Sequence, residues 1–209
     1  QPSIKKNKPI MIVGSVKEDG SLDKRISITP DTAKSLNDLG LKVYLEKKYA
    51  EHLGISDEDY KSVKFFDNPN ELVKSSNLLA QVNCPSKNLI EDFKENSIIL
   101  GMLNPHKNKE TLNNLVQKKI NPFSLELLPR ITRAQSMDVL SSQANLAGYR
   151  AVIDSIYEFE KAIPMMMTAA GTVPAAKVLV IGAGVAGLQA IATAKRLGAI
   201  VSATDVRMA

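Results

Sequence analysis

The chain has 209 residues, 44% of them hydrophobic and 23% charged, which is enough to bury a core without disulfides or metals. The net charge of +5 is spread along the chain, and only 5% of the residues are aromatic. Because nucleic-acid-binding proteins need clustered basic residues or stacking aromatic rings, we expect no nucleic-acid partner. No run of about 18 apolar residues occurs in the sequence, so we predict no transmembrane segment.

Short apolar runs alternate with helical patterns through the first 120 residues. The strand-like runs lie at 9–14, 42–46, 78–82 and 97–102. The helical patterns lie at 30–39, with Pro30 at the first position and Gly40 after the last, and around 88–93 and 109–119. Alternation of this kind predicts a parallel sheet covered by helices.

The single cysteine, Cys84, has no partner for an internal disulfide, which fits a reducing compartment. It stands in an apolar run with no histidine close to it in the sequence. We therefore predict that Cys84 packs in the core, and we predict no metal site.

A second part of the chain begins near residue 121, where Asn and Lys become rarer and Ala, Val and Gly commoner. A helical pattern runs over roughly 137–163, and we expect Pro164 to end or kink that helix. Residues 168–174 predict a turn of small residues, and Met165 to Met167 predict packing at a domain junction. The predicted organisation is an N-terminal α/β domain (1–135), a connecting helix (136–164) and the start of a second domain (165–209).

A glycine-rich loop stands between a strand-like run and a helical pattern in this second part. The apolar run 177–181 precedes Gly182, Gly184 and Gly187, and a helical pattern, a second apolar run and Asp205 follow. The first glycine suits the tight turn, the second the approach of a pyrophosphate, and the third close packing of helix on strand. The helix N-terminus offers free N–H groups to phosphates, and an acid at this spacing accepts from ribose hydroxyls. The arrangement predicts a dinucleotide site.

The acid that ends this unit also bears on the choice of dinucleotide. A carboxylate at Asp205 would repel a 2′-phosphate, which favours NAD(H) over NADP(H), although Arg207 could accommodate that phosphate. The sequence stops four residues after Asp205, so one βαβ unit of the second domain is present. We therefore expect an α/β fold with two Rossmann-like, doubly wound parallel-sheet domains, the second truncated after its first βαβ unit.

Polar side chains gather in residues 130–150, just before and inside the long helical pattern. One interpretation of these side chains is the start of a helix, with Ser136 or Asp138 as the N-cap and an arginine paired with Asp138. The other comes from the whole string. Residues 130–150, followed by 168–171 and the glycine loop, closely resemble the NAD(H)-binding component of proton-translocating nicotinamide nucleotide transhydrogenase. The stretch from Lys17 to Pro30 resembles the opening that this family shares with alanine dehydrogenase.

The resemblance implies hydride transfer from NADH to NADP⁺, coupled to proton translocation across a membrane. It implies a peripheral component on the cytoplasmic or matrix side of an inner membrane, and a homodimer that holds NAD(H). Its partners would be an NADP(H)-binding component and a membrane proton-channel component. The resemblance places catalytic roles on Arg130, Gln135 and Asp138, and further contacts to the cofactor on Ser136, Met137, Ser141, Gly182, Gly184, Val185, Gly187, Asp205, Val206 and Arg207.

An alanine dehydrogenase and a non-catalytic NAD-binding module are the alternatives. Alanine dehydrogenases need a lysine and a histidine for acid–base chemistry. At the matching places this chain has the run 81–83 (Gln-Val-Asn) and the pair Leu103-Asn104. We expect His52 and His106 to be loop or surface residues and Arg25 to be structural, which disfavours the dehydrogenase.

Overall fold

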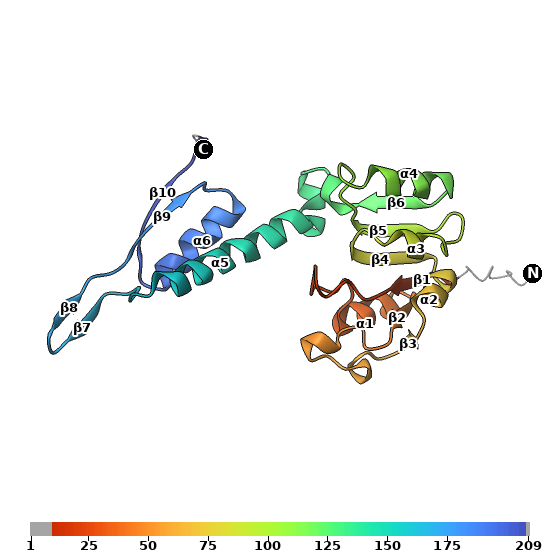
Figure 1. The fold of residues 1–209 in the computed structure, drawn as a ribbon, viewed down its shortest axis with the longest axis horizontal. Helices are drawn as coiled ribbons and strands as arrows, with labels where there is room; N and C mark the ends of the chain where they lie inside the picture. Colours follow the sequence, from red (N-terminus) through yellow and green to blue (C-terminus); the bar gives the residue numbers. More distant parts are fainter. Residues whose placement is uncertain (1–9, 208–209) are drawn as a thin grey trace, which may run out of the picture. The chain divides into compact units, whose positions relative to one another are not determined.

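The computed structural model describes residues 10–207 and divides the chain into two compact units, one up to Pro129 and one from Arg130 onward (Figure 1). The predicted domain limits, 1–135, 136–164 and 165–209, stay a prediction. Of the residues described, no helix is long and apolar enough to cross a membrane.

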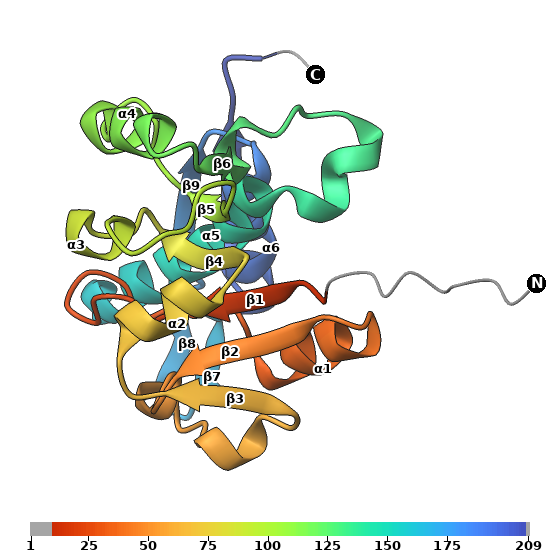
Figure 2. The same cartoon turned by 90° about the vertical axis from the view of Figure 1, so that its right-hand side faces the viewer.

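The first unit is built on a six-stranded sheet whose neighbouring strands are all parallel. The strands are β1 (Ile12–Ser15), β2 (Lys42–Glu46), β3 (Val63–Phe66), β4 (Leu78–Asn83), β5 (Ile98–Met102) and β6 (Asn121–Ser124). They follow the order β3-β2-β1-β4-β5-β6, which Figure 2 shows from the bottom of the sheet to the top. This is the strand order of a doubly wound fold, so the predicted fold class is confirmed for this unit.

Helices cover both faces of this sheet. They are α1 (Pro30–Asp38), α2 (Pro69–Ser75), α3 (Lys87–Ile90) and α4 (Lys109–Gln117), with short 3₁₀ helices η1 (Glu51–Leu53), η2 (Asp57–Asp59) and η3 (Leu125–Leu127). Pro30 begins α1, the Thr29 side chain accepts from the Thr32 N–H, and Gly40 follows with a φ of +82°. These are the start and end signals that the sequence predicts for this helix.

The core lies on both sides of the sheet. On one face Val13, Val43 and Leu45 pack with Ala33 of α1. On the other face Leu79 packs with Leu72 of α2, and Ile99 with Ile90 of α3 and Leu115 of α4. Figure 2 shows α1 on one side of the strands and α2, α3 and α4 on the other. Cys84 is half-buried against the cluster that contains Ile90, Ile99 and Leu115, as predicted, and burial raises the pKa of its thiol.

Two strands and one α-helix of the first unit have no counterpart among the predicted elements. Strand β3 has four residues with the charged Lys64 among them, and β6 contains Pro122, so neither forms a long apolar run. Helix α2 has only seven residues, which is too short for an apolar period to stand out. Pairing with β2 and β5 holds the two strands in the sheet.

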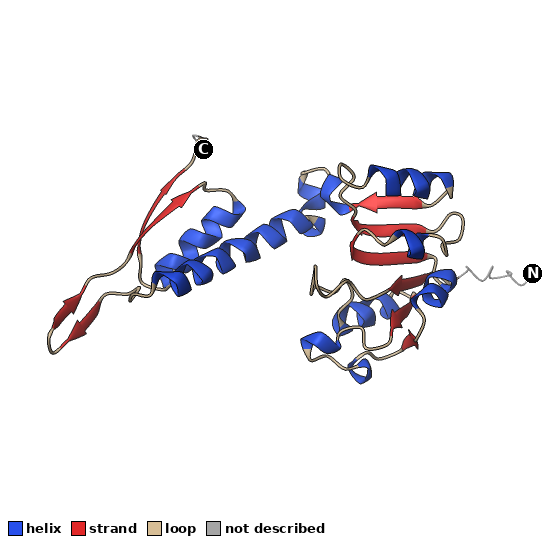
Figure 3. Ribbon diagram, in the orientation of Figure 1, coloured by secondary structure: helices blue, strands red, loops and turns tan. Residues whose placement is uncertain are grey.

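The second unit contains one long helix, a hairpin and a βαβ unit. Its elements are η4 (Thr132–Met137), α5 (Val139–Phe159), β7 (Met166–Thr168), β8 (Gly171–Val173), β9 (Lys177–Ile181), α6 (Val185–Arg196) and β10 (Ile200–Thr204). Strands β9 and β10 pair in parallel and α6 connects them, which confirms the predicted βαβ unit. Helices α5 and α6 lie side by side, and β7 and β8 form an antiparallel pair (Figure 3).

Two local predictions in this unit are wrong. Helix α5 ends at Phe159, because Glu160 adopts a left-handed conformation with a φ of +54°, so Pro164 neither ends nor kinks it. Residues Met165 to Met167 are exposed, where the sequence predicts packing. They lead into and form the β7–β8 hairpin with exposed fractions of 61%, 43% and 82%, because that hairpin presents its side chains to solvent.

Candidate functional site

The glycine loop connects β9 to α6. Gly182 has a φ of +98°, a conformation that other residues rarely adopt, and it makes the tight turn. A Cβ at Gly187 would overlap the carbonyl oxygen of Gly182, so the start of α6 packs against the loop without room for a side chain. The structure therefore contains the turn and the close packing that the spacing of these glycines predicts.

The space beside Gly184 is open. A Cβ built there would meet only the guanidinium of Arg207, at 3.7 Å. Gly184 is also the N-cap of α6, and among the residues described no side chain caps the start of this helix. The N–H groups of that turn and the positive end of the helix dipole are available to an anion.

Asp205 follows β10 and is bound to the glycine loop. Its Oδ2 accepts from the Ala183 N–H at 2.6 Å, and its Oδ1 accepts from the Arg207 N–H at 2.8 Å. The hydrogen bonds from the Arg207 and Ala183 N–H groups lower the pKa of this carboxyl group to about 2. Asp205 is therefore ionised at neutral pH. Val206, beside it, is fully exposed.

Asp138 begins α5. Its carboxylate accepts from the Ser141 N–H at 2.9 Å and from the Ser141 hydroxyl at 2.6 Å. These two bonds lower the pKa of Asp138, and the charge of Arg130 contributes in the same direction. The structure thus contains the N-cap of the first interpretation, made by Asp138 and not by Ser136.

One cavity of about 450 Å³ brings several residues of the predicted site together. Arg130, Ser141 and Ala144 line it from the segment around the start of α5, and Ile181, Gly182, Gly184, Val185, Ala186 and Gly187 line it from the glycine loop. Leu140 lines it as well. Asp138 adjoins the cavity through Ser141, and Asp205 adjoins it through Ala183.

Gln135, Ser136 and Met137 do not line this cavity. They belong to η4 and are exposed to solvent. Leu140 and Ala144, which do line it, are absent from the predicted site because apolar residues four apart in a helix indicate packing and no particular chemistry.

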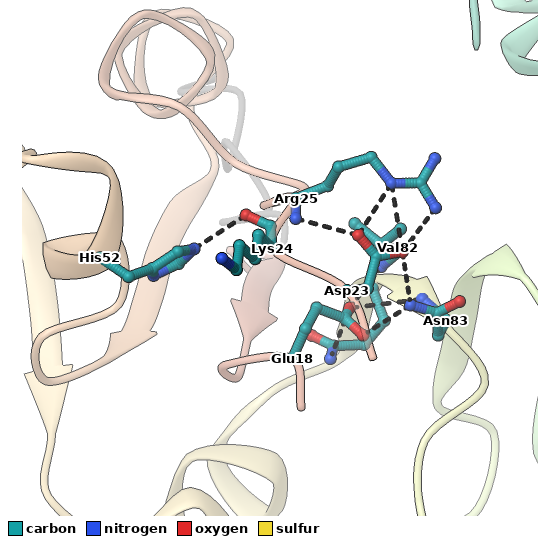
Figure 4. A network of polar contacts seen from close by, with 8 residues as sticks. Glu18, Asp23, Lys24, Arg25, His52, Val82 and Asn83 are labelled. Atoms are coloured by element: carbon teal, nitrogen blue, oxygen red, sulfur yellow. Dashed lines mark hydrogen bonds and ion pairs between the residues drawn. The ribbon is translucent and has the colours of Figure 1, made fainter. Parts of the chain in front are cut away.

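A second polar cluster lies in the first unit, at the carboxyl ends of β1 and β4 (Figure 4). Glu18 accepts from the Val82 N–H at 2.7 Å and from the Asn83 side chain at 3.1 Å. The Asn83 amide also donates to Asp23, and Asp23 pairs with Arg25 at 2.5 Å. The Arg25 guanidinium holds the pKa of Asp23 well below its usual range. Arg25 is therefore engaged in an ion pair within the unit, in line with the structural role expected of it.

Glu18, Asp23 and Asn83 border a cavity of about 670 Å³ in the first unit. Gln81 lines it, and its buried Oε1 accepts from the Ser15 hydroxyl and the Val16 N–H, both at 2.9 Å. The lysine that lines it, Lys17, pairs with Glu46 at 3.1 Å. His52 and His106 are exposed, as predicted, and the His52 ring nitrogen donates to the Lys24 carbonyl at 2.8 Å.

Comparison with known families decides the classification. Residues 14–147 match the sequence model of the alanine dehydrogenase/PNT N-terminal domain, and residues 151–209 match that of the alanine dehydrogenase/PNT C-terminal domain. The chain belongs to the alanine dehydrogenase/PNT family. The predicted family relationship is thereby confirmed.

Within this family the chain is similar to transhydrogenase subunits. It is 44% identical over 205 residues to the Rickettsia prowazekii protein named as the first part of NAD(P) transhydrogenase subunit alpha, covering 95% of this chain and 54% of the relative. It is 44% identical over 206 residues to the protein of the same name from Rhodospirillum rubrum, again covering 95% and 54%. The chain spans about half the length of the curated relatives it matches.

Two solved structures share the fold. The transhydrogenase of Sinorhizobium meliloti superposes with a TM-score of 0.89 at 46% identity, covering 94% of this chain and 59% of that one. An L-alanine dehydrogenase superposes with a TM-score of 0.79 at 21% identity, covering 94% and 55%. The two Rossmann-like units are thus those of the family.

Proposed function

We propose that this chain belongs to the NAD(H)-binding component of a proton-translocating transhydrogenase, which passes hydride from NADH to NADP⁺. The observation that carries the proposal is the cavity of the second unit, where Arg130 and Ser141 meet the glycine loop. The similarity to proteins named as NAD(P) transhydrogenase subunit alpha supports it.

The residues of the second unit fit a dinucleotide. The open space beside Gly184 leaves room for a pyrophosphate, and the uncapped first turn of α6 offers it N–H donors. The ionised Asp205 would accept from ribose hydroxyls and would repel a 2′-phosphate. This chemistry favours NAD(H) over NADP(H) on this chain.

Hydride transfer requires little acid–base chemistry from the protein. The bound dinucleotide supplies the hydride, and neither nicotinamide ring gains or loses a proton. The protein then has to position the ring and exclude water. Arg130, the Ser141 hydroxyl and the Gln135 amide suit that task. Asp138, which accepts two hydrogen bonds from Ser141, would position the Ser141 side chain.

The proposal includes partners and a place in the cell. The relatives' names describe a subunit alpha, which fits an enzyme of several components. We infer an NADP(H)-binding component, a membrane component that carries protons, and a homodimer of the NAD(H)-binding component. The component would lie at the cytoplasmic or matrix side of an inner membrane.

The cavity of the first unit supports a transhydrogenase over an alanine dehydrogenase. The residues described around it present amides from Gln81, Asn83 and Asn104, while its lysine is engaged with Glu46. No histidine of the described chain lines it. An oxidative deamination needs a group that takes up and releases protons near neutral pH, and amides do not do so.

The first test of the proposal is Gln135→Asn in the full-length protein, supplied with its NADP(H)-binding partner. Gln135 lies outside the cavity, three residues before the Asp138 cap of α5. The change tests whether its amide reaches the nicotinamide of bound NADH, because shortening the side chain leaves the helix cap and the glycine loop intact. We expect the rate of hydride transfer from NADH to an NADP⁺ analogue to fall by roughly tenfold or more, with NADH affinity less affected.

The matched control is Gln117→Asn, the same change at an exposed position of α4 in the first unit. It should leave both the rate and the affinity as in the unmodified protein. Unchanged turnover in Gln135→Asn would remove Gln135 from the site.

A further inference from the structure

Gly148 is buried in the middle of α5, where this helix packs against α6. A Cβ at Gly148 would overlap the carbonyl oxygen of Ala186 and lie 3.0 Å from the Ala186 Cα. Both obstacles are backbone atoms, so no change of rotamer could make room for a side chain. The two helices, which lie side by side in Figure 1, therefore touch backbone to backbone at this point.

The contact falls at the helix turn that borders the cavity. Ala186 is the second residue of α6 and lines the cavity beside Gly184. On its other side the same turn meets the glycine loop, where a Cβ at Gly187 would overlap the Gly182 carbonyl. The first turn of α6 is thus held between two contacts that admit no side chain, one made by its own loop and one made by α5.

Gly148 lies on α5 two turns after Ser141, a separation of about 10 Å along the helix axis. Ser141 and Ala144 form the α5 side of the cavity, and the glycine loop forms the other side. The approach of the two helices at Gly148 sets how far apart these two sides stand, because a helix moves as a rigid rod over two turns.

We propose that Gly148 is a positioning residue of the dinucleotide site, although it lies outside the glycine-loop motif. It fixes the separation between the residues that hold the nicotinamide end and those that hold the phosphates and adenosine. The proposal rests on the proposed function of this cavity. A methyl group at position 148 would push α5 away from α6 and widen the site.

The test compares two ligands in the full-length Gly148→Ala protein. NADH contacts both sides of the cavity, whereas 5′-AMP contacts only the side made by the glycine loop and Asp205. We expect NADH affinity to fall roughly tenfold, since small misplacements are costly, and 5′-AMP affinity to stay the same. A purely structural role would weaken both ligands together.

The control for the methyl group itself is Gly20→Ala, where a Cβ meets nothing within 4 Å and φ is not positive. It should change neither affinity. An unmodified protein that fails to bind NADH would overturn the proposed function. If the unmodified protein binds NADH, and Gly148→Ala loses affinity equally for both ligands or loses none, the role of Gly148 is overturned while the proposed function stands.

A second variant covers the case in which Gly148→Ala does not fold. Glycine at position 186 gives the obstructing peptide group more freedom, so Gly148→Ala/Ala186→Gly carries the same methyl group with less strain. Compared with Ala186→Gly alone, it should show the same selective loss of NADH affinity, reduced in size. Equal affinities in these two proteins would contradict the proposal.

Discussion

Asp205 joins the glycine loop to the end of β10 through two hydrogen bonds from backbone N–H groups. With a pKa of about 2 it carries its charge throughout the physiological range. NADH binding should therefore show no pH dependence from this residue between pH 5 and 9, a window far above its titration.

The charge of Asp205 also predicts coenzyme preference. In Asp205→Asn the repulsion of a 2′-phosphate disappears, so the ratio of NADH affinity to NADPH affinity should fall by about fivefold or more. Titration of the full-length protein with each nucleotide measures it. Asp154→Asn, which removes an exposed carboxylate paired with Arg150 on α5, serves as control and should keep the preference. An unaltered ratio in Asp205→Asn would argue against contact with the ribose.

At the scale of elements, two carboxylates of the segment after β1 hold this segment to β4. Glu18 and Asp23 both accept from Asn83, and Asp23 pairs with Arg25. The folded-state pKa of Asp23 is lowered, first by its bonds from Arg25, so its ionisation stabilises the fold. That contribution is fully present above the unfolded pKa of about 3.9 and is lost as the pH falls towards the folded value.

We therefore predict that Asp23→Asn lowers the urea midpoint of unfolding at pH 7, and that its difference from the unmodified protein shrinks below about pH 4. Asp67→Asn breaks an exposed pair with Lys47 and should have little effect at either pH. A difference that stays constant from pH 7 to pH 2 would show that the ion pair does not carry the effect.

The elements that the sequence predicts well are those with local signals. Pro30 and Gly40 bracket α1, and the apolar run of β9 leads into a glycine turn. Strand β6 has no such local signal, because Pro122 interrupts its apolar residues. It forms a strand by pairing with the neighbouring strand β5. The end of α5 escapes prediction for a similar reason, since a single left-handed residue, Glu160, stops the helix four residues before Pro164.

The site shows the same division. The glycine spacing predicts the turn, the helix start and the acid, because all lie within one continuous stretch of chain. The meeting of Arg130 and Ser141 with that loop depends on how α5 packs on α6, which local patterns do not contain. Gly148 illustrates the limit, because a glycine within a helical pattern has no meaning until the carbonyl of Ala186 is beside it.

At the scale of the whole molecule, the two units differ in chemistry. The cavity of the first presents amides and engaged charges, and that of the second presents the loop and helix terminus suited to a dinucleotide. We expect the full-length protein to produce no NADH from NAD⁺ and L-alanine, and to transfer hydride from NADH once the NADP(H)-binding partner is added. Absorbance at 340 nm follows the first reaction; alanine-dependent NADH formation would restore the dehydrogenase assignment.

The exposed methionines of the β7–β8 hairpin have a chemical consequence. Thioethers in contact with water are open to peroxide, which converts them to polar sulfoxides. Met165 and Met167 are more than half exposed, and Met166 nearly so. Mild oxidation should therefore turn this apolar strand into a hydrophilic one before it reaches the buried core.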